Sequence, residues 1–174
     1  MTEPIHTAGV PDLSLDELYD MISAIYAEQN AQRPLSATFA HFVEVCGMLA
    51  IHDRTKRREE FEVEDALCKA LGWYFPLLAK LRVTSVGDLV FRKFPYCCPY
   101  CRSRPHSDAK CKTVQGTKKT VNHEALREKF AENAPMRPRT LNAWQHMFGE
   151  IYPRGVDDVG RGRSTVGLLE ELGE

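Results

Sequence analysis

Apolar residues recur at a spacing of three and four along most of the chain, which is typical of amphipathic helices. The stretch Ser14–Glu17 (SLDE) has the composition of a capping box, and a helix is expected from there to Tyr26. A second helix is expected from about Ser36 to Ile51. A third follows the charged break HDRTKRREE and should kink or weaken at Pro76. A short fourth is capped near Ser85. Since no segment alternates polar and apolar residues, the expected fold is all-α, a bundle of about four helices.

Each predicted helix has an apolar face that we expect to form the core of this bundle. The first carries Leu15, Leu18, Met21, Ile22, Ile25 and Tyr26. The second carries Phe39, Phe42, Val43, Cys46, Leu49 and Ala50. The third carries Phe61, Ala66, Leu67, Ala70, Leu71, Tyr74, Leu77, Leu78 and Leu81. Cys46 and Cys68 lie within these patterns and are expected to be ordinary core residues.

Changes in composition divide the rest of the chain. We expect a flexible N-terminus at 1–13, the helical bundle at 14–94, a cysteine-rich knuckle with a basic linker at 95–121, a linker helix at 122–138, and a further helical segment at 139–174. The last segment contains the amphipathic stretch LNAWQHMFGEIY and closes with STVGLLEELGE.

The closing segment repeats the pattern of the opening one at a constant offset of 126 positions. Identical residues coincide at Leu15/Leu141, Met21/Met147, Ile25/Ile151, Tyr26/Tyr152, Glu44/Glu170 and Gly47/Gly173. Any two amphipathic helices share apolar spacing, so chance resemblance is the alternative. The offset, however, continues without a gap across two helices and the loop between them, and it includes Glu and Gly matches. We therefore interpret residues 139–174 as the opening of a second, incomplete copy of the bundle.

The overall composition narrows the class of protein. The chain has 174 residues, 43% of them hydrophobic, which suffices for one ordinary domain or two small ones. Its formal net charge of −1 points to no particular partner. No apolar run approaches the ~20 residues of a membrane span, and the N-terminus lacks the pattern of a signal peptide. We expect no membrane association and a cytoplasmic location.

Four of the six cysteines cluster in CCPYCRSRPHSDAKC, and this cluster predicts a metal site. Cys98 and Cys101 form a Cys-x-x-Cys pair around a proline, and His106 and Cys111 can complete a tetrahedral zinc site. Such a closed shell of four protein ligands makes the zinc structural, and its binding would drive the folding of so short a loop. Cys97 is a rival fourth ligand and His123 a more distant one. Reduced cysteines without a metal are the alternative.

The knuckle is also basic. Between Arg92 and Lys119 there are eight Lys or Arg and one acid, Asp108. Such a loop could contact phosphates of a nucleotide or of nucleic acid, with Arg92 and Lys93 as candidates, or it could simply keep the knuckle soluble. The whole-chain charge argues against a nucleic-acid binder, and the few aromatic residues here do not support stacking on single strands.

At several of these motifs the chain resembles the MazG-like nucleoside triphosphate pyrophosphohydrolases. VGLLEELGE, preceded by LNAWQHMFGEIYPRG, is similar to the opening of that family. EDALCKALGWYFPLLAKL, followed by FRKFPYCCPYC, resembles its later helices in members that carry a cysteine knuckle after the bundle. The resemblance covers most of residues 14–101 and again 139–174. It implies an all-α fold, symmetric dimers or tetramers, and magnesium-dependent cleavage of an NTP to an NMP and pyrophosphate.

The family's first acidic motif, Glu-x-x-Glu, falls on Glu171 and Glu174 of the second copy. Spaced three apart, these carboxylates share one helix face and could hold a hard divalent ion. The alternative is a solvated helix face. In the first copy the same positions are Val45 and Met48, which cannot bind magnesium.

The second acidic motif, Glu-x-x-Asp, can be placed in two ways in the first copy. Glu62 and Asp65 have the right spacing, but alignment of GWYF with the family's aromatic stretch puts the motif on Leu67 and Ala70 instead, and we favour this second alignment. Under either placement the 174 residues lack a complete acidic metal site. The first copy is therefore interpreted as degenerate.

Three functions remain open at this stage. The resemblance implies a protein of the nucleotide pyrophosphohydrolase family. Its first domain would be non-catalytic and would have a structural or dimerising role. Magnesium would be the cofactor if the chain is catalytically competent. The second possibility is a zinc-stabilised protein-interaction module without enzymatic activity. The third is a nucleic-acid binder that uses the basic knuckle. We expect a homodimer, with a nucleotide as a possible ligand.

Overall fold

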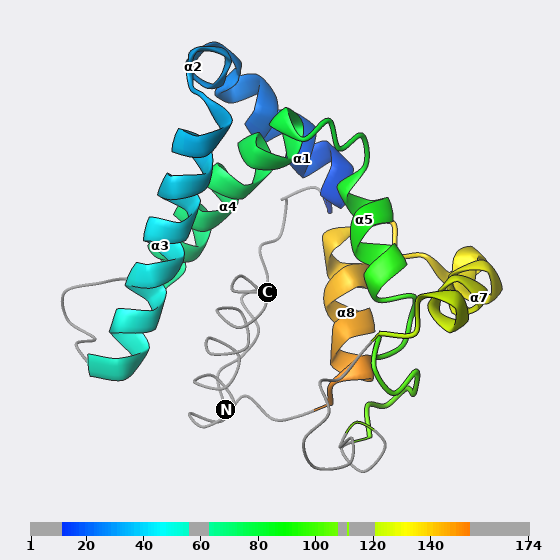
Figure 1. The fold of residues 1–174 in the computed structure, drawn as a ribbon. Helices are drawn as coiled ribbons and strands as arrows, with labels where there is room; N and C mark the ends of the chain where they lie inside the picture. Colours follow the sequence, from blue (N-terminus) through cyan, green and yellow to red (C-terminus); the bar gives the residue numbers. More distant parts are fainter. Residues whose placement is uncertain (1–11, 56–62, 108–110, 112–120, 154–174) are drawn as a thin grey trace. The chain divides into compact units, whose positions relative to one another are not determined.

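The computed structural model describes residues 12–55, 63–107, 111 and 121–153, and the structural statements below concern these residues. They form helices and a short 3-10 turn, with no strand in the described part of the chain, so the predicted all-α class is confirmed (Figure 1). The elements are α1 (Leu15–Ile25), α2 (Ala27–Gln32), α3 (Leu35–Thr55), α4 (Val63–Lys80), α5 (Val86–Lys93), α7 (His123–Asn133), η1 (Ala134–Met136) and α8 (Leu141–Ile151).

The chain divides into two compact units. Among the described residues, unit 1 comprises 12–18, 86–107, 111 and 121–153, and unit 2 comprises 19–55 and 63–85. This division differs from the boundary expected at residue 94, because α5 belongs with the knuckle and α8. Phe91 of α5 packs against Phe130 at 5.6 Å and Trp144 at 6.2 Å between ring centroids, and these contacts hold α5 in unit 1.

Unit 2 is built on the pairing of α3 with α4, which lie side by side in Figure 1. Phe42 and Cys46 of α3 pack against Leu77 of α4, with Ala70, Trp73 and Tyr74 around them. The α1 helix adds Tyr19, whose ring meets Phe75 edge-on at 5.7 Å and whose hydroxyl donates to the Val83 carbonyl at 3.0 Å. A buried hydroxyl needs such a partner, so this bond fixes the α1 end of the unit.

Two features of unit 2 depart from the sequence-based expectations. Residues 27–32, between the first and second predicted helices, form the short helix α2, and Lys80 donates from Nζ to the carbonyls of Asn30 and Arg33 near the end of α2, both at 2.6 Å. The α3 helix extends to Thr55, into the predicted charged break, because charged residues lower helix propensity only slightly. The α4 helix includes Pro76, which is buried, and the kink or weakened turn expected there stays a prediction.

The predicted core faces of unit 2 are only partly correct. Phe42, Cys46 and Ala66 are buried, but Phe39 and Val43 are exposed. Leu67, Leu71 and Leu81 on and after α4 are exposed as well. The prediction that Cys68 is a core residue is wrong, since this thiol is exposed. The reason is that α3 and α4 are apolar on more than one face, and only the faces turned toward each other are covered.

Unit 1 gathers α5, α7 and α8 around one hydrophobic cluster. Its buried members are Phe91, Cys98, Cys111, Trp144, Met147 and Ile151. Asn122 caps α7 by accepting from the Ala125 amide at 3.0 Å, and buried Asn133 at the other end donates to the Pro95 carbonyl at 2.7 Å. Two of the clustered cysteines therefore lie inside the main core of this unit and not on a surface loop.

The first helix of each proposed copy begins with a hydroxyl cap. Ser14 and Glu17 form the predicted capping box of α1, with reciprocal bonds of 3.1 and 2.8 Å. Thr140 caps α8 by accepting from the Ala143 amide at 3.3 Å. The α8 helix has the 11 residues of α1, and both of its ends are displaced from those of α1 by the 126-residue offset.

A polar contact joins the starts of α1 and α5 in unit 1. The Arg137 guanidinium lies 3.4 Å from an Asp16 oxygen and 3.2 Å from an Asp88 oxygen. The amide of Gly87 donates to Asp16 at 3.0 Å, and a Cβ atom at Gly87 would lie 2.5 Å from Arg137. A larger residue at position 87 would therefore require the Arg137 guanidinium to shift.

Within the described ranges, none of the helices has both the length and the apolar character that crossing a bilayer requires.

Candidate metal centre

The segment after α5 makes a tight loop that turns Cys98 and Cys101 toward each other. The Arg102 amide donates to the Cys98 carbonyl at 2.8 Å, and the Cys98 amide donates to the Ser103 carbonyl at 3.2 Å. Arg102 adopts a left-handed conformation with φ of 56°, and Tyr96 before the loop does the same with φ of 58°. Left-handed residues allow the chain to reverse within a few positions, which a Cys-x-x-Cys metal loop requires.

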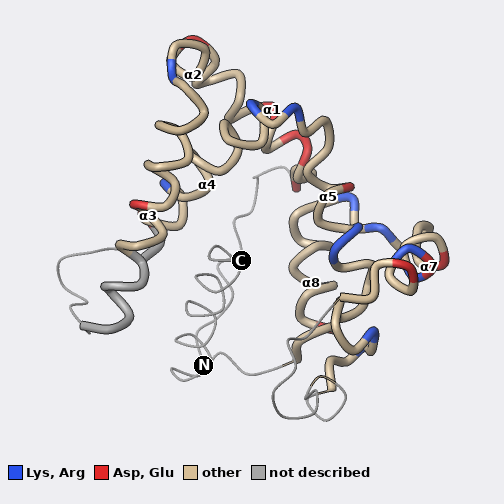
Figure 2. Tube along the Cα trace, in the orientation of Figure 1, with Lys and Arg blue, Asp and Glu red and all other residues tan. Residues whose placement is uncertain are grey.

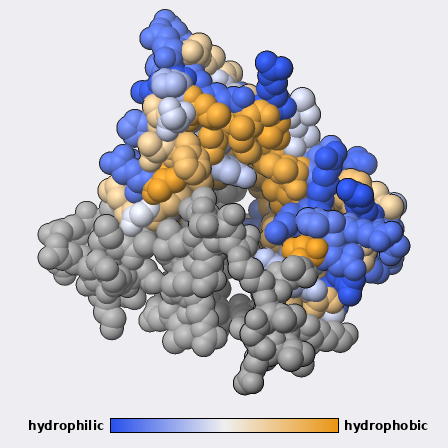
Figure 3. Space-filling view, in the orientation of Figure 1, coloured by the Kyte–Doolittle hydropathy of each residue, from blue (hydrophilic) through white to orange (hydrophobic). Residues whose placement is uncertain are grey.

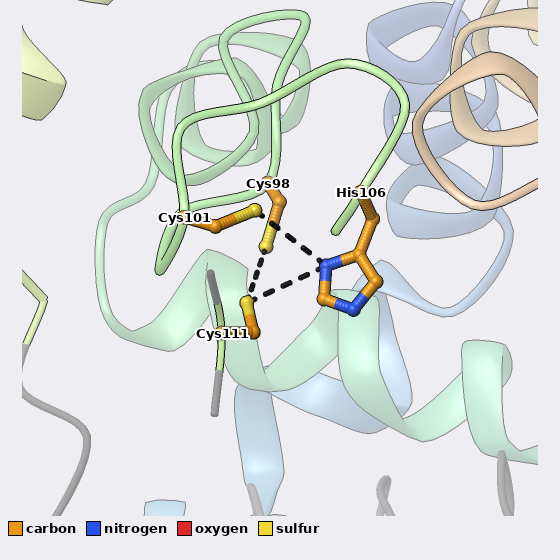
Figure 4. Close-up of side chains that lie close together, drawn as sticks. All are labelled: Cys98, Cys101, His106 and Cys111. Carbon is orange, nitrogen blue, oxygen red and sulfur yellow. Dashed lines mark hydrogen bonds between the residues drawn. The ribbon is translucent and has the colours of Figure 1, made fainter. Parts of the chain in front are cut away.

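The four predicted ligands, Cys98, Cys101, His106 and Cys111, converge on one point (Figure 4). Their ligand atoms all lie within 4.8 Å of one another. The Cys98 and Cys111 sulfurs are 3.7 Å apart, and His106 Nδ1 is 3.7 Å from the Cys101 sulfur and 3.5 Å from the Cys111 sulfur.

These separations fit one tetrahedral ion. Zinc lies about 2.3 Å from sulfur and about 2.0–2.1 Å from imidazole nitrogen, so a regular tetrahedron separates two sulfurs by about 3.8 Å and a sulfur and a nitrogen by about 3.6 Å. A cluster of three cysteines and one histidine at these distances could bind a metal such as zinc. With four protein donors no position stays open for substrate, which is the arrangement of a structural site.

The donors are well shielded from solvent. Cys98 and Cys111 are 1% and 3% exposed, and Cys101 and His106 are partly buried. Thiolates at these two buried positions and one half-buried position would carry a large desolvation cost without a cation. A divalent ion at their centre would offset that cost, so the placement of the sulfurs in the core itself favours metal binding.

The pKa values of the three thiols show how strongly they interact. Burial opposes ionisation of Cys101, but the amides of Ser107 and Ser103 and the neighbouring thiols lower its pKa to about 6. The pKa of Cys98 is also lowered, because hydrogen bonds from the Cys101 and Tyr100 amides outweigh its burial. Burial and the adjacent Cys101 and Cys98 raise the pKa of Cys111 to about 12. Two thiols thus ionise readily while the third resists, and a bound cation would remove that resistance.

The rival fourth ligands do not join the cluster. Cys97 is buried, and burial raises the pKa of its thiol. The charges of Lys129 and Glu132 on α7 also act on this thiol. His123 is exposed at the start of α7. His106 is therefore the fourth donor in this structure, through Nδ1.

The end of α8 contributes residues that the sequence did not indicate. The Ile151 carbonyl accepts from the His106 amide at 2.7 Å, and the Tyr152 ring lies 5.4 Å from the His106 ring. Glu150 pairs with Arg104 at 3.1 Å. These residues lie about 40 positions after the knuckle, and no spacing rule connects them with it.

Two of the described basic residues near the knuckle lie over aromatic rings. Arg92 is exposed, Lys93 lies over the Tyr100 ring at 5.7 Å, and Arg104 lies over the Tyr96 ring at 4.4 Å. Figure 2 shows Lys and Arg around the end of α5 and on the segment after it, with Asp and Glu interspersed on α7. Four other basic residues of this loop, Lys110, Lys112, Lys118 and Lys119, lie outside the described residues, so its contact with phosphates stays a prediction.

Of the four acidic candidates, Asp65 alone lies in the described part of the chain. Glu62, Glu171 and Glu174 lie outside the described residues. Asp65 is exposed and pairs with Lys69 on the next turn of α4. The alternative positions carry apolar side chains: Leu67 is exposed and Ala70 packs against the α3–α4 core.

Comparisons of this chain with family models, with curated proteins and with solved structures found no match.

Proposed function

We propose that this chain is a MazG-like helical protein stabilised by structural zinc, and that its first copy serves to pair subunits and not to hydrolyse nucleotides. The observation that carries the proposal is the convergence of Cys98, Cys101, His106 and Cys111 at the distances of a tetrahedral zinc site. Three thiolate ligands suit a reducing compartment such as the cytoplasm.

The side chains at the family's metal positions support a non-catalytic role for the first copy. Val45 is buried and Met48 is exposed on α3, and neither offers an oxygen ligand. Magnesium in nucleotide hydrolases requires carboxylates to bind it beside the phosphates. If the chain hydrolyses nucleotides, the carboxylates come from the second copy.

The surface of unit 2 supports a role in pairing. Among the described side chains of unit 2, ten large apolar ones are exposed: Met21, Ile25, Tyr26, Leu35, Phe39, Val43, Met48, Leu67, Leu71 and Leu81. Leu35, Phe39 and Val43 form a stripe at a spacing of four along α3. Figure 3 shows hydrophobic residues gathered on the surface of unit 2. Helices that are apolar on more than one face are typical of bundles that bury the second face in a larger assembly.

Metal analysis of protein purified without chelator tests the zinc centre. We expect one zinc per chain, retained in Cys97→Ser and lost in Cys101→Ser, because only the second thiol belongs to the cluster. Absence of zinc from the unaltered chain, or equal loss in both variants, would contradict the centre.

Sedimentation over a range of concentrations tests the pairing. We expect a dimer that dissociates in Phe39→Ser/Val43→Ser, since these changes place hydroxyl groups on the apolar stripe of α3. Leu89→Ser is the matched control, because Leu89 is equally exposed but belongs to unit 1. A monomer at all concentrations would refute a self-pairing role.

Incubation with NTPs and magnesium tests catalysis. We expect no pyrophosphate from residues 1–153. This piece contains the first copy and only the first helix, α8, of the second copy. Turnover by this piece that Glu62→Gln or Asp65→Asn abolishes would show that the first copy is catalytic after all.

A further inference from the structure

A pocket of about 300 Å³ opens in unit 2 between α4 and the segment that carries α2. Tyr26, Asn30 and Arg33 line one wall, and α4 supplies Cys68, Lys69 and Trp73 to the other. This volume stands at the lower end of the range of small-molecule sites, which is roughly 300–1,000 Å³. None of these residues belongs to the metal cluster or to the apolar stripe of α3, so the functions proposed above leave the pocket unused.

A glycine helps to keep this pocket open. Gly72 lies inside α4 and also lines the pocket. No other described part of the chain comes within 4 Å of a Cβ atom built at this position. Close packing therefore does not require the glycine, and glycine weakens a helix relative to alanine. The missing side chain contributes space to the pocket, and a residue placed there would occupy that space.

The guanidinium of Arg33 is held in place at the wall of the pocket. Its Cζ atom lies 4.9 Å from the centroid of the Trp73 ring, and that ring stacks on His41 at 4.5 Å between centroids. Lys80 holds the backbone of the same segment, because its ammonium donates to the carbonyls of Asn30 and Arg33. A cation that is ordered in advance loses little further freedom when it binds an anion.

The charge of Arg33 differs from that of Lys69 on the opposite wall. Lys69 pairs with Asp65 on the preceding turn of α4, whereas no carboxylate of the described residues pairs with Arg33. A guanidinium can form two parallel hydrogen bonds with a carboxylate or a phosphate. The rings of Tyr26 and Trp73 add apolar surface, which suits the carbon skeleton of the same ligand.

We propose that this pocket binds a small organic anion, whose carboxylate or phosphate group pairs with Arg33 and whose carbon skeleton lies against Tyr26 and Trp73. The site shares no residue with the metal cluster. It goes beyond the zinc and pairing roles proposed above, and its failure or theirs would be seen in separate experiments.

Cys68 supplies the readout, since this thiol is exposed and lines the pocket. The rate at which iodoacetamide alkylates Cys68 in the full chain is followed by mass spectrometry of its peptide, with phenyl phosphate, benzoate or the neutral benzyl alcohol added. We expect one or both acids to slow the alkylation in a saturable way, and benzyl alcohol to leave it unchanged. The acid that protects at lower concentration shows whether the ligand is a phosphate ester or a carboxylic acid.

Two variants separate the charge of the pocket from its space, each measured against its own rate without an added acid. Arg33→Gln should raise the concentration of acid needed for protection about 10-fold, because a hydrogen bond to a charged group is lost. Gly72→Leu should abolish protection, because the new side chain fills the pocket. Gly149→Leu is the matched control: it lies in α8 of unit 1, and a Cβ atom there also meets no described atom within 4 Å.

A pair of reagents of equal size tests the charge without any added ligand. Iodoacetate is anionic and iodoacetamide is neutral, so the ratio of their rates at Cys68 reports the local potential. Arg33→Gln should lower this ratio about threefold, the effect of one charge some 5 Å away in a largely aqueous setting. Arg127→Gln, an exposed position of α7 in unit 1, makes the same change in net charge and should leave the ratio unchanged.

Three results would overturn the site. The first is the absence of protection by both acids, and the second is protection by benzyl alcohol equal to that by the acids. The third is an unchanged protecting concentration together with an unchanged reagent ratio in Arg33→Gln. This last variant alters an exposed side chain, so the test stands even if Gly72→Leu does not fold.

Discussion

Met21 and Ile25 occupy on α1 the positions that Met147 and Ile151 occupy on α8, 126 residues further along the chain. Met21 is 45% exposed and Met147 is fully buried. Ile25 is 61% exposed, whereas Ile151 is again fully buried. The same residue types at the same helical spacing thus lie in opposite environments.

The knuckle explains the difference. Met147 and Ile151 pack against Phe91 and against two cysteines of the metal cluster, Cys98 and Cys111. The described part of unit 2 has no counterpart of the knuckle, and the face of α1 is left to solvent or to a partner. The spacing of apolar residues therefore identifies the apolar face of a helix. Whether that face is buried in a core depends on which element packs against it.

Removal of zinc should have the largest effect on stability. It should also abolish the difference in burial between the matching residues of α1 and α8. Treatment with a chelator, or Cys101→Ser, should unfold unit 1, since structural zinc contributes on the order of 10 kcal/mol to folding. Unit 2 should persist, because its core of Phe42, Cys46 and Leu77 contains no ligand.

The two tryptophans report on the units separately. Trp144 is buried in unit 1 and Trp73 lies in unit 2. The emission of Trp73→Phe, in which Trp144 remains, should shift to longer wavelength on chelation, and that of Trp144→Phe should not. Equal shifts in both variants would mean that the units fold as one.

Truncation of the paired isoleucines should have the next largest effect. Ile151→Ala leaves a cavity in the unit 1 core and should lower the free energy of unfolding by about 2–5 kcal/mol. Ile25→Ala should cost less than about 1 kcal/mol in dilute protein, since an exposed side chain loses little on truncation. Denaturant titration measures both.

The loss of unfolding free energy caused by Ile25→Ala should also be measured at several protein concentrations. If this loss grows with concentration, Ile25 lies in an interface between subunits. A cost for Ile151→Ala as small as that for Ile25→Ala in dilute protein would contradict the burial difference.

Tyr19 allows a test with a smaller expected effect, at a pair of positions where the buried residue lies on α1 and the exposed one on α8. It is the residue of α1 that unit 2 buries, while Gln145 at the corresponding position of α8 is exposed. Tyr19→Phe removes the bond to the Val83 carbonyl and should destabilise unit 2 by about 1 kcal/mol. Gln145→Ala should have no measurable effect on thermal unfolding, and a larger loss there than at Tyr19 would reverse the assignment.

The acidic groups at the helix starts should make the smallest contribution to stability. Thr140 and Ser14 hold the pKa values of Asp12 and Glu17 below the ordinary 3.8 and 4.5. Because these pKa values are depressed in the folded protein, the stabilisation is complete above the ordinary values and is lost as pH falls through the folded ones. Asp12→Asn/Glu17→Gln should therefore show a flatter acid unfolding curve than the unaltered chain, and identical curves would refute the contribution of these caps.

Sequence alone predicted the all-α class, the longer helices and the four members of the metal cluster, but not the short helix α2. The spacing of Cys98 and Cys101, with His106 and Cys111 nearby, is local information, and so is the capping box at Ser14. Local chemistry decides these features before the chain folds. The predicted core faces of α3 and α4 failed in part for the opposite reason: Phe39 and Cys68 follow an apolar pattern, but only tertiary contacts could show which side of each helix is covered.

The support from α8 was also beyond prediction. Tyr152 matches Tyr26 in the repeat, and that match carries no sign that one of the two rings lies 5.4 Å from the ring of His106. Contacts between positions 106 and 152 depend on how α5, the knuckle and α8 pack, which periodicity cannot express. The second acidic motif remains a prediction, because Glu171 and Glu174 lie outside the described residues.

The separation between the ligands and their support along the chain has a consequence during synthesis. All four donors leave the ribosome about 40 residues before Tyr152. At 5–20 residues per second this interval lasts roughly 2 to 8 seconds. If the four donors bind zinc as proposed, the loop can capture the ion in that time, while solvent still reaches it. The later arrival of α8 would then close the core over a filled centre, so the order of translation would favour metal loading before enclosure.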